Sequence, residues 1–217
     1  MLATQLLASG ITHLTDARYF AAWEVDYLAF PVGANNPEAI SWDYLNALRE
    51  WVEGPAIVAE LGAIGEVDAW VKVLREQRID HALVLHPVPA SAPEKFKTAG
   101  IQLILHVPVE GYQDVDDVAE ALATGADAGA IVLDFERGGI TLADLKAGHP
   151  FGLPALDQVL QQHTCLLRID LGTTDPKAFS EAHPIAGFAV RGSSEEKVGY
   201  KSFDDLDGLF EGLEVFE

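Results

Sequence analysis

Short runs of β-forming residues alternate with longer segments of helical period along the whole chain, and eight such runs recur about every 25 residues. This alternation predicts parallel pairing of the strands, because each helix carries the chain back across one face of the sheet. Eight is also the number of strands that closes a parallel sheet into a barrel. The expected strands are Thr4–Ser9, Tyr27–Pro31, Ala56–Glu60, Ala82–His86, Gln102–Val107, Ala130–Asp134, Cys165–Asp170 and Gly187–Arg191.

The segments between these strands have the features of helices, and several begin with residues that cap helices. Asp175, for example, stands directly before Pro176, and this pair suits a first helical turn. The expected helices lie near Thr15–Glu24, Trp42–Glu53, Gly65–Arg78, Ala92–Ala99, Val115–Thr124, Leu153–His163, Pro176–Ala182 and Phe203–Gly212.

No Pro- or Gly-rich linker and no low-complexity segment interrupts the series. We therefore predict an α/β fold in which residues 1–217 form a single (β/α)₈ barrel domain. The alternative is an open, doubly wound parallel sheet, which usually has fewer strands and often a Gly-rich first loop. The first loop here, Ser9-Gly10-Ile11-Thr12-His13, lacks that Gly pattern and so favours the barrel.

The chain is strongly acidic, with a formal net charge of -20 from 34 acidic and 14 basic residues. Such a surface repels phosphate backbones and anionic lipid headgroups, so we expect no nucleic-acid partner and no membrane partner. Cys165 is the only cysteine, which rules out an internal disulfide, and no Cys/His zinc spacing occurs. No secretory signal and no run of 18 apolar residues is present. These features predict a protein of the reducing cytoplasm.

In a (β/α)₈ barrel, the functional residues lie at the carboxyl ends of the strands and in the loops that follow them. Seven of the eight expected strands end in polar or charged side chains, and the second ends in Phe30-Pro31. In strand order these side chains are Ser9, Glu60, His86, His106, Asp134 with Glu136, Arg168 with Asp170, and Arg191 followed by Gly192-Ser193-Ser194. We expect them to meet at one end of the barrel.

Two histidines, His86 and His106, end neighbouring strands, and Glu60 and Asp134 end the strands on either side. Imidazoles flanked by carboxylates fit three roles. They form hydrogen-bonded structural pairs, they act as acid-base groups with a reference pKa of about 6.5, or they bind a divalent metal. No tight sequence motif supports a metal site, so we expect no metal and no cofactor. Metal-assisted chemistry through the two histidines stays an alternative.

Short motifs follow the expected strands in a recognisable order: Gly10-Ile11-Thr12 with Asp16-Ala17, then Asp26–Phe30, Leu85-His86, Leu133-Asp134 with Gly138-Gly139, and Gly199-Tyr200-Lys201. Together they resemble the phosphoribosylanthranilate isomerase family, the (β/α)₈ barrels of tryptophan biosynthesis. The first motif, for instance, is similar to the family's Lys-x-Cys-Gly-Ile-Thr and the Asp-Ala that follows it. The resemblance spans Leu7 to Leu213 and implies the same fold.

The resemblance also implies an Amadori rearrangement, in which a phosphorylated aminoaldose opens and becomes a 1-amino-1-deoxyketose. That reaction needs a general acid at the ring oxygen and a general base for the C2 proton. The family's acid maps onto Asp134, although a carboxyl group at a barrel mouth also serves as a hydrogen-bond anchor. The family's base is a Cys that maps onto Ser9, and an alcohol is a far weaker base than a thiol with a pKa of about 8.5. His86, His106 or an assisted Ser9 is therefore the expected base.

Two other family positions differ in this chain. Leu7 stands where the family has Lys, and Ala34-Asn35-Asn36-Pro37 stands where the family has an Arg for the substrate carboxylate. Asn donates hydrogen bonds but has neither the charge nor the forked geometry of Arg.

The family's phosphate clamp consists of backbone N–H groups in a Gly-Gly turn after the seventh strand and a Ser-Gly turn after the eighth. The corresponding turns here are Arg168-Ile169-Asp170-Leu171-Gly172 and Arg191-Gly192-Ser193-Ser194. Asp170 repels phosphate, whereas Arg168 and Arg191 supply positive charge. The residues assigned to substrate and phosphate binding are Arg168, Asp170, Gly172, Arg191, Gly192 and Ser193.

Two functional hypotheses follow. In the first, the chain is a phosphoribosylanthranilate isomerase-like enzyme, a monomer or homodimer, that acts on a small anionic phosphorylated substrate with Asp134 as the acid and another group as the base. In the second, it is a diverged barrel that lacks this reaction. Such a barrel binds another small phosphorylated or carboxylated ligand, with metal assistance through His86 and His106 as one option, or acts as a non-catalytic partner.

Overall fold

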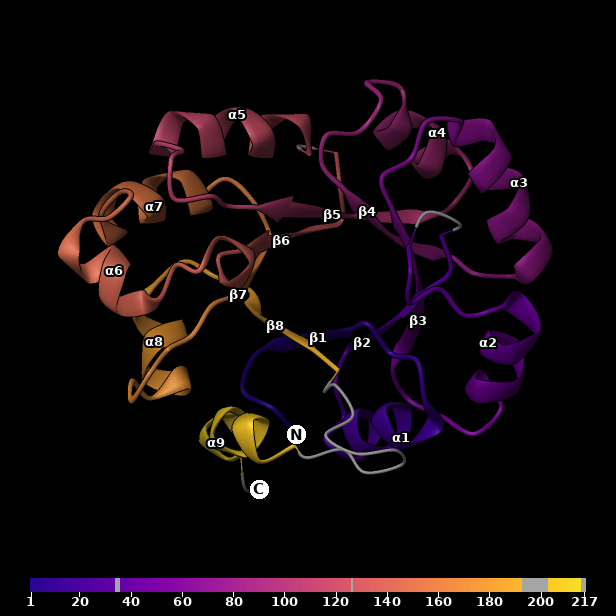
Figure 1. Ribbon diagram of the computed structural model, residues 1–217, viewed down its shortest axis with the longest axis horizontal. Coiled ribbons are helices and arrows are strands. Elements are labelled where there is room, and N and C mark those ends of the chain that lie inside the picture. Colours follow the sequence, from indigo (N-terminus) through magenta and orange to yellow (C-terminus); the bar gives the residue numbers. More distant parts are fainter. Residues whose placement is uncertain (34–35, 126, 193–202, 216–217) are drawn as a thin grey trace.

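The computed structural model describes residues 1–33, 36–125, 127–192 and 203–215, and these residues form a closed barrel of eight parallel strands. The strands follow one another around the barrel in chain order, and β8 pairs with β1 to close it (Figure 1). The (β/α)₈ prediction is therefore confirmed, and the open-sheet alternative is wrong. The strands are β1 Gln5–Ser9, β2 Tyr27–Pro31, β3 Ala56–Gly62, β4 His81–Leu85, β5 Gln102–Pro108, β6 Ala130–Asp134, β7 Cys165–Arg168 and β8 Gly187–Arg191.

Helices form an outer ring around these strands (Figure 1). They are α1 Leu14–Ala22, α2 Trp42–Arg49, α3 Val67–Gln77, α4 Ala92–Thr98, α5 Val115–Thr124, the 3₁₀ turn η1 Glu136–Gly138, α6 Leu142–Ala147, α7 Leu153–Leu160, α8 Pro176–Ala182 and α9 Asp204–Leu213. Among the described residues, no helix is both long enough and apolar enough to cross a membrane.

Several element ends differ from the sequence-based expectation. The helix expected to reach Glu53 ends at Arg49, because Gly54, with a φ of 107°, and the following Pro55 belong to the turn that leads into β3. The strand expected to reach Asp170 ends at Arg168, because the Asp170 side chain accepts a hydrogen bond from the N–H of Gly172 and turns the chain. The short helix α6 was not expected at all.

The strand residues alternate between the barrel interior and the layer beneath the helices, as the pleat of a β-strand requires. The side chains that fill the interior belong to Leu7, Ala29, Val58, Leu83, Ile104, Ala130, Val132, Leu166 and Ala189. Residues two positions further along the strands therefore also face inward, at the carboxyl end of the barrel. We call this end the mouth, and its inward residues include Ser9, Glu60, His106, Asp134, Arg168 and Arg191.

The first and last parts of the described chain lie together beside the seam between β8 and β1 (Figure 1). The rings of Tyr19 in α1 and Phe203 stack with centroids 3.8 Å apart, and the Tyr19 hydroxyl donates to Asp207 of α9 over 3.0 Å. Burial and the bond to Asp207 raise the pKa of Tyr19 to about 12, so this hydroxyl stays a donor throughout the neutral range. The contact holds α9 against α1.

The same seam contains a close approach of two backbones at Gly187, the first residue of β8. A Cβ atom on Gly187 would lie 1.9 Å from the carbonyl oxygen of Gln5. We expect Gly187→Ala to lower the free energy of unfolding by about 2–4 kcal/mol, because the two strands would have to move apart. Urea unfolding followed by circular dichroism measures this change.

Gly208 supplies the matched control, since it lies in α9 and no atom comes within 4 Å of the position that a Cβ atom would occupy there. Gly208→Ala is expected to leave stability unchanged or to raise it by up to about 1 kcal/mol, as Ala favours helix. Equal stability of the two variants would contradict the role assigned to the Gly187 approach.

Candidate functional site

The guanidinium of Arg168 crosses the mouth of the barrel and connects three strands. Its Nη1 donates to Oδ2 of Asp134 over 3.0 Å, and its Nη2 donates to Oγ of Ser9 over 2.6 Å and to the carbonyl oxygen of Val190 over 3.3 Å. The Arg168 residue is only 4% exposed, and its Nε is buried without a hydrogen-bond partner among the described residues. Arg168 is therefore a fixed part of the barrel interior, with its charge committed to Asp134.

Asp134 receives hydrogen bonds from three groups at the end of β6. The ring Nε2 of His106 donates to Oδ2 over 2.8 Å, Arg168 donates to the same oxygen, and the N–H of Arg137 donates to Oδ1 over 3.1 Å. Burial by itself raises the pKa of Asp134, but the bond from His106 and the charge of Arg168 outweigh it, and the pKa lies below its ordinary value. Asp134 is consequently a carboxylate at neutral pH, a state that suits an anchor better than a general acid.

His106 stands between Asp134 and a cavity of about 420 Å³ in the mouth, which we call the mouth cavity. Because a carboxylate only accepts hydrogen bonds, the bond to Asp134 places the proton of the neutral ring on Nε2 and leaves Nδ1 as an acceptor. Nδ1 has no partner in the part of the chain that the structure describes. Leu83, Leu85 and Arg137 also line this cavity. An imidazole held by a carboxylate, with its second nitrogen free, is the arrangement of a general base.

Ser9 is hydrogen-bonded within the protein on both sides. Its Oγ accepts from Arg168 over 2.6 Å and donates to the carbonyl oxygen of Val190 over 3.3 Å. Among the described residues, no imidazole or carboxylate accepts the Ser9 proton. Ser9 therefore has no partner that would make it a base or a nucleophile.

His86 lies just beyond β4 and does not line the mouth cavity, although Leu83 and Leu85 do. The strand alternation accounts for this, because a side chain one position after an inward residue belongs to the outer face. Burial lowers the pKa of His86, which keeps the ring neutral near pH 7. Nowhere in the described ranges do three or more His, Cys, Asp or Glu residues form a group suited to a metal ion. The metal alternative through His86 and His106 thus finds no support in the geometry.

A larger cavity of about 800 Å³, the side cavity, lies between the ends of β7 and β8 and the helices α8 and α9. Asp170, Gly172 and Arg191 line it, as do Glu136 and Asp175. Partial desolvation raises the pKa of Glu136; the charge of Arg168 opposes this rise, and the charges of Asp134 and Asp170 add to it. The side cavity is thus predominantly acidic.

The backbone donors assigned to a phosphate clamp already have acceptors. The N–H of Gly172 donates to Oδ1 of Asp170 over 2.8 Å, and the N–H of Gly192 donates to the carbonyl oxygen of Ser9 over 2.8 Å. Ser193, also assigned to the clamp, lies outside the described residues. Phosphate binding by these turns stays a prediction.

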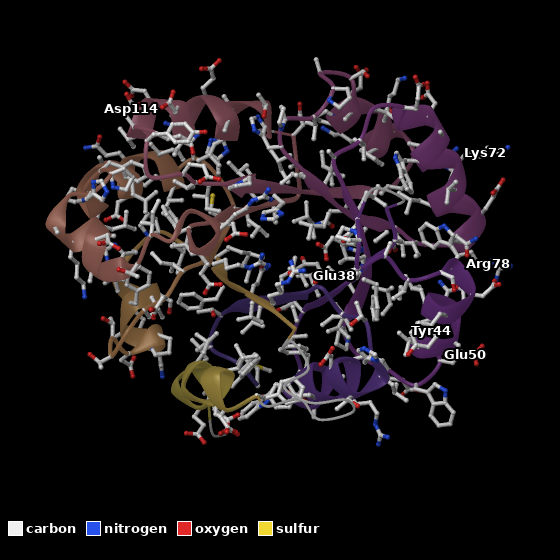
Figure 2. All side chains as sticks on the ribbon, viewed as in Figure 1. Glu38, Tyr44, Glu50, Lys72, Arg78 and Asp114 are labelled. Atoms are coloured by element: carbon white, nitrogen blue, oxygen red, sulfur yellow. The ribbon has the colours of Figure 1, made fainter. Side chains whose placement is uncertain are left out.

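Two further mouth residues did not emerge from the sequence. Glu38, in the loop between β2 and α2, pairs with Arg191 and points toward the middle of the ring (Figure 2). Arg137 lines the mouth cavity beside His106. Glu60 was expected at the mouth, and its Oε2 accepts the N–H of Gly10 over 2.9 Å. An Arg at the end of an otherwise apolar strand was the one signal for a buried ion pair at Arg168, since a buried charge needs a partner.

Comparison with solved structures finds the same architecture in phosphoribosylanthranilate isomerases. The enzyme from Thermus thermophilus is 20% identical over 96% of this chain and 98% of its own, with a TM-score of 0.70. The enzyme from Thermotoga maritima is 16% identical over 97% and 98%, with a TM-score of 0.73. A 3-hexulose-6-phosphate synthase, 12% identical over 97% and 100%, also matches with a TM-score of 0.62. No family model and no curated protein sequence matches the chain. At these identities the likeness shows the fold alone.

Replacing Asp134 tests the buried ion pair. We expect Asp134→Asn to lower the free energy of unfolding at pH 7 by roughly 3–5 kcal/mol, because Arg168 would keep its charge without a counter-charge. The pKa of Asp134 is lowered by folding, so its contribution is complete above the unfolded pKa of about 3.9 and disappears as the pH falls through the folded value. The difference between wild type and variant therefore shrinks below about pH 4.

Urea titrations at a series of pH values measure both effects. Asp68→Asn is the control, because Asp68 pairs with Lys95 at the surface, where its side chain is 78% exposed. That substitution is expected to cost less than about 1 kcal/mol. A cost for Asp134→Asn as small as this, or one that stays constant with pH, would contradict the assigned role.

Proposed function

We propose that the chain is a proton-transfer enzyme of the isomerase type, similar to phosphoribosylanthranilate isomerase, in which His106 moves the proton. The observation that carries this proposal is the 2.8 Å contact between Nε2 of His106 and Asp134, with the other ring nitrogen left as an acceptor beside the mouth cavity. The likeness of the fold to phosphoribosylanthranilate isomerases makes their reaction the first one to test.

In the proposed reaction, the protonated imidazole of His106 donates its proton to the ring oxygen of an aminoaldose, and the ring opens to a protonated Schiff base. The neutral imidazole then removes the proton from C2, which produces an enolamine and restores the imidazolium. The enolamine becomes the 1-amino-1-deoxyketose when C1 gains a proton and the C2 hydroxyl loses one. A single imidazole serves both steps because donating the first proton leaves the ring in the neutral form that accepts the second.

Asp134 is a positioning residue in this scheme. Its carboxylate accepts the Nε2–H of His106 and so fixes the orientation and tautomer of the ring. Arg168 in turn holds Asp134 in place over 3.0 Å. The phosphorylated aminoaldose belongs in the mouth cavity and the side cavity, because Arg191 lines both of them.

A second candidate function is a ligand-binding barrel without isomerase activity. The hydrogen bonds of Ser9, Gly172 and Gly192 favour it, because the groups at the positions of the family's base and phosphate clamp are already engaged within the protein. Such a barrel would bind a small phosphorylated or carboxylated ligand at the mouth.

Replacing each of the two histidines separates the catalytic proposal from the alternatives. We expect His106→Gln to lower kcat/KM for phosphoribosylanthranilate by about 100-fold or more, because one acid-base group typically contributes 10²–10⁴ in rate. Gln retains an N–H donor toward Asp134, so the variant is expected to fold. The measurement is the fluorescence decrease as the substrate is consumed, recorded from pH 5 to 9.

The control is His86→Gln, which changes the other strand-end histidine and is expected to leave the rate within about twofold of wild type. Equal losses in the two variants, or none in either, would contradict the assignment to His106. A wild type without turnover would remove the isomerase proposal and leave the ligand-binding barrel.

Ser9→Cys tests how much of the isomerase pocket is present. The Arg168 nitrogen 2.6 Å from Oγ would stabilise a thiolate at this position and oppose the rise in thiol pKa that burial causes. We expect kcat/KM for phosphoribosylanthranilate to rise by about tenfold, because a thiolate is a competent base for the C2 proton. The ultraviolet absorbance of the thiolate across pH, measured as the difference from wild type, gives the thiol pKa independently. A reactive thiolate without any gain in rate would contradict an isomerase-like pocket.

A further inference from the structure

The side chain of Arg191 spans the end of β1 and contacts the opposite loop. It lies over Gly10, where a Cβ atom would come within 3.3 Å of Cγ and 3.4 Å of Cζ and Nε of Arg191. Gly10 also has a φ of 67°, which favours glycine. Beyond Gly10, Nη2 of Arg191 forms an ion pair with Oε2 of Glu38. Figure 2 shows Glu38 toward the middle of the ring, whereas Glu50 projects from its outside.

Arg191 forms part of the wall of both cavities. Among the described residues that line the side cavity, Arg191 is the only Arg or Lys. The other guanidinium at this end of β7 and β8, that of Arg168, is committed to Asp134. Arg191 is therefore the described residue that can form an ion pair with an anionic group in the side cavity. Glu38 already forms an ion pair with it.

We propose that Glu38 is an internal competitor for the anion-binding position on Arg191, and that a phosphate or carboxylate group of a ligand binds at the mouth by displacing it. Glu38 then determines which anions bind, because only a group that interacts with Arg191 more strongly than the Glu38 carboxylate takes its place. The inference goes beyond the proposed reaction, since it concerns ligand charge and does not depend on His106.

The exposure of the pair makes such an exchange feasible. The side chains of Arg191 and Glu38 are 47% and 50% exposed, so water screens the ion pair and its net contribution is small. Glu38 also belongs to a loop, and its carboxylate is hydrated readily once released. Other carboxylates nearby, including Glu60, Glu136 and Asp170, repel a free anion. Among the described residues of the side cavity, Arg191 is therefore the position that retains an anion, and the anion must replace Glu38 there.

Inorganic phosphate and benzoate are the probes, each titrated separately by calorimetry so that phosphate and carboxylate recognition are distinguished. We expect Glu38→Gln to lower the Kd of at least one of them by about two- to sixfold, because the variant no longer has to release an ion pair of the strength typical at a protein surface. Arg191→Gln is expected to abolish the binding.

Glu136→Gln is the matched control, because it removes the same charge from the wall of the side cavity without touching the pair. Its effect on Kd is expected to be smaller than that of Glu38→Gln. In the Arg191→Gln background, Glu38→Gln should have no further effect. Equal effects of the two Glu variants, an unchanged Kd in Glu38→Gln, or no binding of either probe to any variant would overturn the proposal. Turnover by wild type in any of these cases would leave the proposed reaction standing.

Discussion

The buried guanidinium of Arg168 determines how the mouth of this barrel is organised. A charge in the barrel interior is tolerated only with a counter-charge and hydrogen bonds, and Asp134, Ser9 and the carbonyl oxygen of Val190 supply them. The same contacts determine the protonation and hydrogen bonding of the neighbouring side chains. They hold Asp134 as a carboxylate and fix Ser9 as a hydrogen-bonded alcohol. His106, beside the mouth cavity, keeps an acceptor nitrogen that no other described residue contacts.

In the proposed reaction, the mouth residues of this shared architecture have roles that differ from those the family resemblance implies. In the phosphoribosylanthranilate isomerase family that the sequence resembles, the Asp at the end of the sixth strand is expected to donate a proton, whereas Asp134 here is placed to orient His106. The proposed proton-transfer residue on β5 lies at the same mouth as the family's residue on β6, because parallel strands end at the same place. The fold permits this shift without altering the barrel core.

The fold was predictable from the sequence because the period of apolar runs specifies each strand and helix locally. The helix α6 was missed because it has only six residues, although its capping box, Thr141 with Asp144, was visible in the sequence. His86 was expected at the mouth because it ends a predicted strand. Side chains alternate along a strand, so residues at steps of two from the inward-facing Leu83 share its face, and His86 is not one of them. The pairing of Arg168 with Asp134 and of Arg191 with Glu38 was not predictable, since it depends on strand register and on the path of the β2–α2 loop.

The pairing of Arg168 and Arg191 with carboxylates also affects how fast an anionic ligand arrives. With both guanidinium groups neutralised at short range, the field that a distant anion experiences is dominated by the net charge of -20. That field slows the association of an anion with the barrel. Dissolved salt screens the field over about 10 Å at ~0.1 M. Association of an anion with this barrel should therefore become faster as ionic strength rises, the reverse of the behaviour of enzymes that guide their substrates by opposite charge.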